Sequence, residues 1–211
     1  MAPMPSLEPL APEAALAEDA ALLERHGSRL LALARASIAW RLREGALMAC
    51  EVADHPPELR ARRAVFVTLI EQGRLRGCVG TPVAWRTLVE DVVDNAAAAA
   101  VEDMRFEPLE AAALERVAIA LSVLSRPTAL RAASEEALIA QLVPGRDGLV
   151  LSEGARKALF LPQVWRQLPK PRDFLAQLKA KAGLPQHHWS PSLEFQRFSS
   201  TSVAEPGAAG H

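Results

Sequence analysis

Apolar residues recur at helical spacing in several stretches of the chain. Residues 28–44 place leucine, isoleucine and alanine on one face and arginines on the other, with Ser28 suited to cap the start and Gly45 to end the helix. Residues 88–100 carry a stripe of leucine and valine opposite acidic residues that include Asp91, and then run into alanines. We therefore expect helices over residues 12–27, 28–45, 88–100, 134–142 and 171–183.

Between these helices the apolar pattern changes to a period of two residues, which is typical of strands. Residues 64–70 are rich in β-formers, a turn follows at residues 71–73, and the chain returns through residues 74–79, so this part predicts a hairpin. A second hairpin is expected where a turn at residues 152–154 joins two further apolar runs. The arms of this second hairpin are expected at residues 149–151 and 157–161, and the remaining strands at residues 46–52, 117–123 and 193–198.

The order hairpin, helix, strand occurs twice along the chain. There is no βαβ rhythm, no GxGxxG fingerprint and no P-loop signature. The sequence therefore predicts an α+β fold with a mixed or antiparallel sheet and two related lobes, each built from a hairpin, helices and a further strand. Four prolines in residues 1–12 predict a disordered leader, residues 13–203 form the domain as two intertwined lobes, and residues 204–211 are expected to be a disordered tail.

Composition and charge narrow the classes of function. The formal net charge of −1 gives no bulk electrostatic reason to expect nucleic acid or an anionic membrane as partner. The short basic run Arg60-Ala61-Arg62-Arg63 is either a solvated edge or a small phosphate-binding patch. Two cysteines make neither a disulfide framework nor a metal cluster, so no metal or cofactor is expected. With no signal peptide and no membrane-spanning run, the sequence predicts a cytoplasmic protein.

The stretch GRLRGCVGTP, residues 73–82, contains the first candidate for chemistry. Cys78 could be a reactive thiol, because on a flat strand Arg74 and Arg76 would share its face and favour a thiolate. It could equally be buried as a small apolar residue. Gly77 and Gly80 interrupt the strand pattern, which marks either a close approach to a ligand or tight packing against a helix.

Other polar residues stand out in the remaining motifs. Asn95, among alanines, could bond a backbone group and lock a neighbouring loop. Arg105 could hold an anion or form an ion pair with Asp103 or Glu107 that stabilises the turn after the helix. Lys181 could bind an anion or simply favour the end of its helix. The adjacent His187 and His188 could bind a metal or belong to an ordinary loop. The second cysteine, Cys50, resembles a buried core residue.

Four segments together resemble the AMMECR-type domain family, and the resemblance extends over roughly residues 28–203. They are LRGCVGT at 75–81, NAAAAAVEDMRFEPL at 95–109, FLPQVW at 160–165 and LKAKAGLPQHHW at 178–189. Val79 stands where isoleucine is more usual, and Met104 where many members have proline. The resemblance implies an α+β fold with two related lobes. It also implies that the LRGC stretch, which maps here to residues 75–80, is an active or binding site.

In bacteria and archaea, such a chain looks like protein A of the AmmeMemoRadiSam system. The resemblance implies two companions, a Memo-like protein and a radical SAM protein with an iron-sulfur cluster. This chain has no CxxxCxxC motif and is therefore not itself the radical enzyme. Two hypotheses follow: an enzyme or enzyme subunit that acts through Cys78 on a small or peptide-like substrate oriented by Arg76, or a non-catalytic partner module that presents the same groove. RNA binding is disfavoured because the chain has no tyrosine and few aromatic residues for stacking.

Overall fold

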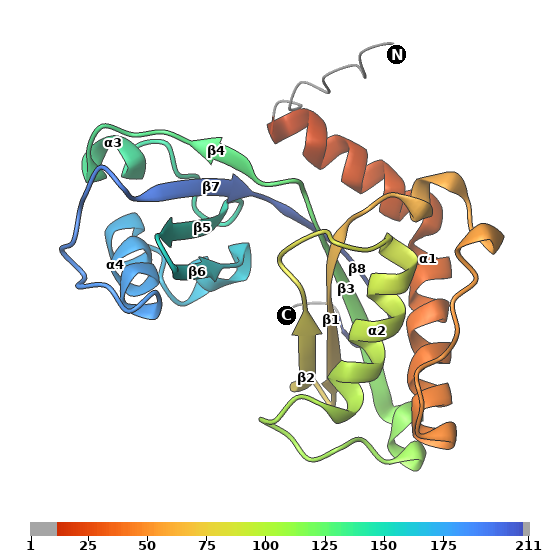
Figure 1. Ribbon diagram of the computed structural model, residues 1–211. Coiled ribbons are helices and arrows are strands. Elements are labelled where there is room, and N and C mark those ends of the chain that lie inside the picture. Colours follow the sequence, from red (N-terminus) through yellow and green to blue (C-terminus); the bar gives the residue numbers. More distant parts are fainter. Residues whose placement is uncertain (1–11, 209–211) are drawn as a thin grey trace, which may run out of the picture. The chain divides into compact units, whose positions relative to one another are not determined.

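The computed structural model describes residues 12–208, and its contacts divide the chain into two compact lobes (Figure 1). Among the described residues, the larger lobe consists of residues 19–125 and 201–208. The smaller lobe contains residues 126–200 together with residues 12–18. Each lobe has its own sheet and its own hydrophobic core, so the predicted α+β fold with two related lobes is confirmed.

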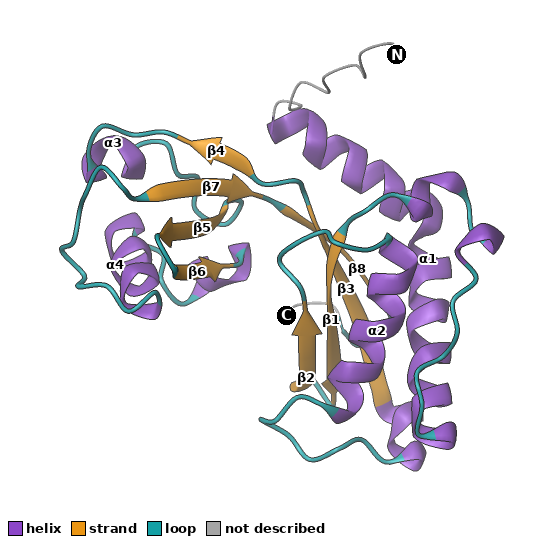
Figure 2. Ribbon diagram, viewed as in Figure 1, coloured by secondary structure: helices purple, strands orange, loops and turns teal. Residues whose placement is uncertain are grey.

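In the larger lobe, a four-stranded sheet has the order β2-β1-β3-β8, and β2 therefore forms one edge of the sheet. Two helices pack on one face of it, and the core lies between them and the inward residues of the strands (Figure 2). Strand β1 pairs antiparallel with both β2 and β3. The elements are α1 (Pro12–Glu44), β1 (Ala64–Glu71), β2 (Arg74–Gly80), α2 (Leu88–Val101), β3 (Val117–Leu124) and β8 (Ser200–Ala204).

The smaller lobe repeats this plan with a second four-stranded sheet, in the order β4-β7-β5-β6. Its core joins the inward residues of the sheet to α3, α4 and a stacked pair of rings, Trp165 and Phe174, whose centroids are 3.8 Å apart. Ser134 caps α3 by accepting a hydrogen bond from the Ala137 N–H. The elements are β4 (Thr128–Leu130), α3 (Glu135–Ile139), β5 (Gly148–Glu153), β6 (Arg156–Phe160), α4 (Pro171–Lys181) and β7 (Glu194–Phe198).

The first helix differs from the expectation, because α1 runs without interruption from Pro12 to Glu44. Gly27 does not end a helix, and Ser28 does not begin one. A Cβ atom at Gly27 would lie 2.8 Å from the Val203 Cγ2 atom of β8. This glycine therefore serves to let a strand approach the helix, which is a packing role that sequence alone cannot distinguish from a helix stop.

The predicted strand at residues 46–52 is wrong. The segment has no regular structure before Val52, and Leu47 is 52% exposed. A strand needs a partner for its backbone, and the strand order β2-β1-β3-β8 includes no strand from residues 46–52. Apolar alternation alone therefore does not produce a strand here.

The predicted tail is also wrong for the part that the structure describes, residues 204–208. Strand β8 lies beside β3, and the Glu205 carboxylate accepts a hydrogen bond of 2.9 Å from the Ile119 N–H and binds Arg35. Ala208 is buried. The serine and threonine content of β8 hid it, since an edge strand needs few apolar residues. Residues 209–211 and the leader up to residue 11 lie outside the described residues, whereas Pro12 already belongs to α1.

Candidate functional site

Cys78 lies on the edge strand β2, paired with Thr68 of β1. Its thiol is half-buried, and the Thr68 Oγ1 atom donates a hydrogen bond of 3.4 Å to the Cys78 Sγ atom. Both side chains lie on the face of the sheet opposite the core, because their neighbours Val67 and Leu69 belong to the core cluster. The thiol is therefore held on an outer face rather than packed as a small apolar core residue.

A β-bulge changes which residues share that face. Gly77 pairs with Leu69, but the next pair is Leu75 with Ile70, so Arg76 is the extra residue. The extra residue shifts the alternation of side chains between the two faces of the sheet. Arg74 therefore does not share a face with Cys78, as it would on a flat strand. Sequence periodicity cannot reveal a bulge of one residue.

The bulged residue Arg76 is engaged with the protein itself. Its Nη2 atom donates a hydrogen bond of 3.4 Å to the Pro108 carbonyl, and its Nε atom lies 3.9 Å from the Glu71 carboxylate. The bond to Pro108 joins the hairpin to the segment that follows α2, and the contact with Glu71 lies within the hairpin. A role for Arg76 in orienting an anionic substrate stays a prediction.

The main-chain groups of Cys78 are held by Asp103 and Arg105 from the segment after α2. The Cys78 N–H donates to the Asp103 Oδ2 atom at 2.8 Å, and the Arg105 Nη2 atom donates to the Cys78 carbonyl at 3.2 Å. The two side chains also form an ion pair at 2.7 Å. The predicted ion pair is therefore confirmed. Its two side chains also bind the N–H and the carbonyl of Cys78, which an edge strand would otherwise offer to another chain.

The electrostatics of this pair bring a positive charge near the thiol. The hydrogen bond from Arg105 holds the pKa of Asp103 well below its usual range, with the Cys78 N–H adding to the effect. The pKa of Arg105 is raised, first by its hydrogen bond to Asp103 and to a smaller extent by the Cys78 side chain. The Arg105 guanidinium is thus a cation within electrostatic reach of the Cys78 thiol.

Both glycines of the motif are needed for packing inside the lobe. A Cβ atom at Gly77 would lie 2.2 Å from the Ala99 carbonyl oxygen of α2. A Cβ atom at Gly80 would lie 2.4 Å from the ring of Phe66 and 2.6 Å from the Val65 carbonyl oxygen. Of the two alternatives open from the sequence, the geometry supports close packing; contact of these glycines with a ligand stays a prediction.

Two side chains of α2, Asn95 and Asp91, bind the main chain of Val65 in β1. Asn95 Nδ2 donates to the Val65 carbonyl at 3.1 Å, and the Val65 N–H donates to the Asp91 carboxylate at 2.8 Å. The predicted backbone bond of Asn95 is confirmed, but it holds strand β1 and not a loop. Asp91 was expected on the solvent side of α2 but is fully buried. Its position one turn before Asn95 is the signal that could have placed it on the inner face.

Lys181 lies in the smaller lobe, so the structure does not bring it together with the other predicted site residues within one lobe. Its Nζ atom donates to the Leu159 carbonyl at 3.1 Å and is 5.2 Å from the Phe160 ring centroid. Its neighbour Lys179 was missed: this side chain is fully buried and contacts Glu135 at 2.5 Å. Binding of an anion by Lys181 stays a prediction.

The histidine pair separates into two environments. His187 is exposed, whereas His188 Nε2 lies 3.0 Å from both carboxylate oxygens of Glu153. Among residues 12–208, no group of three histidine, cysteine or acidic side chains could hold a metal ion. The same carboxylate accepts hydrogen bonds from Ser190 at 2.5 Å and Ser192 at 2.8 Å, so it anchors the loop before β7.

This anchoring predicts a pH dependence of stability. The hydrogen bonds from Ser190, His188 and Ser192 lower the pKa of Glu153 to about 2. A carboxyl with a lowered folded-state pKa contributes stability above its ordinary pKa and loses it as the pH falls toward 2. Glu153→Gln should therefore lower the urea midpoint at pH 6, and the difference from wild type should shrink between pH 4.5 and 2. The exposed Glu194→Gln serves as control, and an equal effect of both substitutions would contradict the anchoring.

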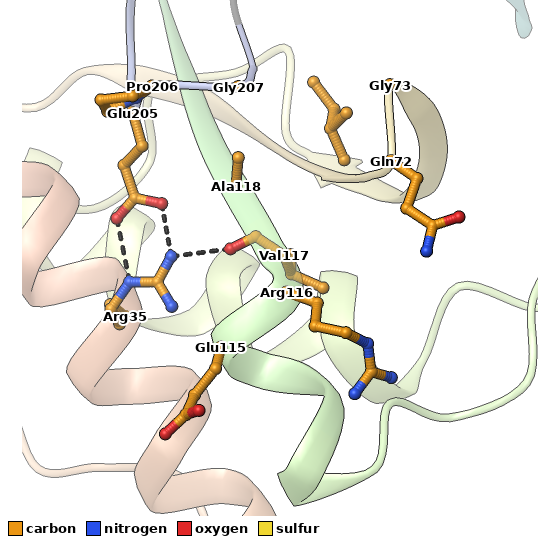
Figure 3. A pocket seen from close by; sticks show the side chains of 11 residues that line it. Arg35, Gln72, Gly73, Glu115, Arg116, Val117, Ala118, Glu205, Pro206 and Gly207 are labelled. Carbon is orange, nitrogen blue, oxygen red and sulfur yellow. Dashed lines mark hydrogen bonds and ion pairs between the residues drawn. The ribbon is translucent and has the colours of Figure 1, made fainter.

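An open pocket of about 470 Å³ lies at the turn of the β1–β2 hairpin (Figure 3). Gln72 and Gly73 line one side, and Arg35, Glu205 and Pro206 line another. None of residues 75–80 lines it, so this pocket is not the groove expected along the motif. Figure 3 also shows that Arg35 is bound by the Glu205 carboxylate and donates to the Val117 carbonyl, which makes it a structural residue that holds the C-terminal segment.

Fold and site together define a two-lobed α+β protein with a partly exposed cysteine on a clamped edge strand. The sequence model of the AMMECR1 family matches residues 31–203. The chain belongs to the AMMECR1 family. None of the helices within residues 12–208 is long and apolar enough to cross a membrane.

Relatives from archaea support the same assignment. A protein of Methanosarcina acetivorans is 36% identical over 180 residues, which cover 84% of this chain and 90% of the relative. A protein of Thermococcus gammatolerans is 37% identical over 190 residues, which cover 85% and 90%. The crystal structure of an uncharacterised protein from Pyrococcus horikoshii is similar with a TM-score of 0.77 and 32% identity, covering 86% of this chain and 92% of that one.

Proposed function

We propose that this protein is an enzyme or enzyme subunit in which Cys78 is a reactive thiol toward a small or peptide-like substrate. One observation carries the proposal: the half-buried thiol receives a hydrogen bond from Thr68 and lies within the electrostatic reach of Arg105. A hydroxyl donor and a guanidinium are the groups that stabilise negative charge on sulfur, and the thiolate is the nucleophilic form.

The arrangement also keeps the thiol in place. Asp103 and Arg105 bind the N–H and the carbonyl of Cys78, so the residue that bears the thiol is positioned from both sides. Fixed positioning of a nucleophile is what a catalytic site requires. Asp103 and Arg105 are therefore positioning residues in this proposal, and Arg105 has the second role of placing charge near sulfur.

A non-catalytic partner module is the second candidate. It is favoured by the fact that Gly77, Gly80 and Arg76 contact the protein's own chain. In either case, we propose a Memo-like protein and a radical SAM protein as the companions to test. Co-purification with either protein in mild salt, retained in Cys78→Ser, would favour the module over the enzyme.

Alkylation rates of the two cysteines test the reactive thiol. Burial, followed by the charges of Glu90, Asp94 and Glu51, raises the pKa of Cys50, which makes it an internal control of low reactivity. At pH 7.5, we expect iodoacetamide to modify Cys78 on the order of tenfold faster than Cys50, measured by mass spectrometry of the two peptides.

Arg105→Gln should slow the modification of Cys78 and leave Cys50 unchanged. The matched control is Arg116→Gln, because Arg116 is also an exposed, ion-paired arginine of the larger lobe but pairs with Glu71. If Cys78 reacts no faster than an unperturbed cysteine, and Cys78→Ser leaves function in cells intact, nucleophilic catalysis by this residue is ruled out.

A further inference from the structure

The Arg105 guanidinium has unused hydrogen-bond donors beside Cys78. Its Nε and Nη2 atoms donate to the Asp103 carboxylate at 2.9 and 2.7 Å, and Nη2 also donates to the Cys78 carbonyl at 3.2 Å. The Nη1 atom has no partner among residues 12–208, and the side chain of Arg105 is 58% exposed. The two N–H groups of Nη1 are therefore available to a ligand.

The ion pair presents its cation, and not its carboxylate, to solvent. Asp103 is 7% exposed, and its oxygens also accept hydrogen bonds from the main-chain N–H groups of Cys78 and Arg105. The pair forms with Asp103 rather than with Glu107, which is exposed. The Asp103 carboxylate is thus fully engaged inside the protein, whereas one nitrogen of the guanidinium is not.

The position of this nitrogen relates it to the thiol. Nη2 binds the carbonyl of Cys78 itself, and Nη1 is the neighbouring nitrogen of the same planar group. The Cys78 side chain also contributes to the raised pKa of Arg105, so the guanidinium and the thiol interact electrostatically. An anion bound at Nη1 would therefore lie close to the sulfur atom.

Arg76, which the sequence suggested as the residue that orients a substrate, is less available. Its side chain is 21% exposed, its Nη2 atom donates to the Pro108 carbonyl, and its Nε atom lies 3.9 Å from the Glu71 carboxylate. Arg105 is more exposed and hydrogen-bonds to the residue that bears the thiol. The geometry therefore favours Arg105 over Arg76 as the group that meets an anion beside sulfur.

The class of anion follows from the donors that remain. Recognition here depends on hydrogen bonds and not on net charge, because Asp103 offsets the charge of Arg105 and the exposed Glu107 belongs to the same segment. Two N–H groups on one nitrogen suit a single carboxylate. A phosphate group carries roughly two negative charges and three acceptor oxygens, and most of these would stay unpaired at this position.

We propose that the substrates of the Cys78 thiol are small carboxylic acids whose carboxylate is attached to the carbon atom that sulfur attacks, and that Arg105 Nη1 binds this carboxylate. Sulfur forms the new bond to that carbon, the leaving group departs with its electron pair, and the thiol proton passes to water. This inference rests on the proposed function, because it names the substrate class of the same thiol.

A comparison of iodoacetate with iodoacetamide tests the substrate class. The two reagents have the same methylene carbon and the same leaving group, and they differ in a carboxylate against a neutral amide. Both react with the thiolate, so the ratio of their rate constants does not depend on the pKa of the thiol. At Cys78, we expect a ratio of iodoacetate to iodoacetamide about fivefold or more above that of N-acetylcysteine amide, a neutral free thiol, by mass spectrometry at pH 7.5.

Three substitutions locate the group that binds the carboxylate. Arg105→Gln should return the ratio to that of the free thiol, whereas Arg76→Gln should keep the preference for iodoacetate. Arg74→Gln is the matched control, because it removes an exposed arginine of the same hairpin that does not share a face with Cys78. The rate at the half-buried Cys50 reports folding, since unfolding would expose this thiol and accelerate its alkylation.

The outcomes separate this inference from the proposed function. Fast alkylation of Cys78 by both reagents, with the ratio of the free thiol, would leave the reactive thiol in place and overturn the carboxylate class. Slow alkylation of Cys78 by both reagents would contradict the reactive thiol itself. A preference lost in Arg76→Gln but kept in Arg105→Gln, or lost equally in Arg74→Gln and Arg105→Gln, would show that Arg105 Nη1 is not the binding group.

Discussion

Gly77→Ala is expected to destabilise the larger lobe by about 3 kcal/mol, or to prevent its folding. The added Cβ atom would lie 2.2 Å from the Ala99 carbonyl oxygen. Because that oxygen belongs to the backbone of α2, no rotation of a side chain can relieve the clash. Either the helix must move away from the strand or the strand must leave the sheet, and both expose core residues.

The measurement is urea unfolding followed by circular dichroism, with Gly45→Ala as control. Gly45 has a φ of +71°, but a Cβ atom added there would have nothing within 4 Å, so its substitution costs only backbone strain, about 1 kcal/mol. The difference between the two variants isolates the close approach of α2 to β2. Equal losses in the two variants would show that Gly77 is not required for packing.

Clear periodicity in the sequence was sufficient to predict most of the elements. The β1–β2 hairpin, α2 and β3 follow the predicted residues closely, because each has a regular apolar period and turn residues at its ends. The elements that failed depend on partners distant in the sequence. Val203 of β8 packs closely against α1 because residue 27 is a glycine, and a local pattern cannot contain that information.

The sequence was sufficient to predict where along the chain the candidate site lies, but not how its side chains are arranged. The glycines and the cysteine marked the β2 strand, and the Asp103–Arg105 ion pair was among the sequence expectations. The bulge at Arg76 was not, and it removes Arg74 from the face of the thiol. Arg105 brings a cation near the thiol and donates to the Cys78 carbonyl from a position 27 residues further along the chain.

Asp91→Ala should be the other severe substitution, with a loss of about 3 kcal/mol or more. Asp91 accepts a hydrogen bond from the Val65 N–H at 2.8 Å and binds Arg86, whose side chain is only 12% exposed. Removing the carboxylate leaves the buried Val65 N–H without its acceptor. It also leaves the largely buried guanidinium of Arg86 with Asp94 as its remaining ion-pair partner. Asp94→Ala is the control, since Asp94 is 36% exposed and should contribute about 1 kcal/mol or less.

Asp91→Asn distinguishes the hydrogen bond from the charge. Burial is the largest influence on Asp91 and raises its pKa, although Arg86 and the Val65 N–H oppose this shift. A raised folded-state pKa means that ionisation of this carboxyl opposes folding, so the neutral amide avoids that penalty and still accepts from Val65. The expected loss for Asp91→Asn is therefore about 1 kcal/mol, well below that of the alanine variant. Equal losses would show that the ion pair with Arg86, and not the backbone hydrogen bond, is the main contribution of Asp91 to the stability of the lobe.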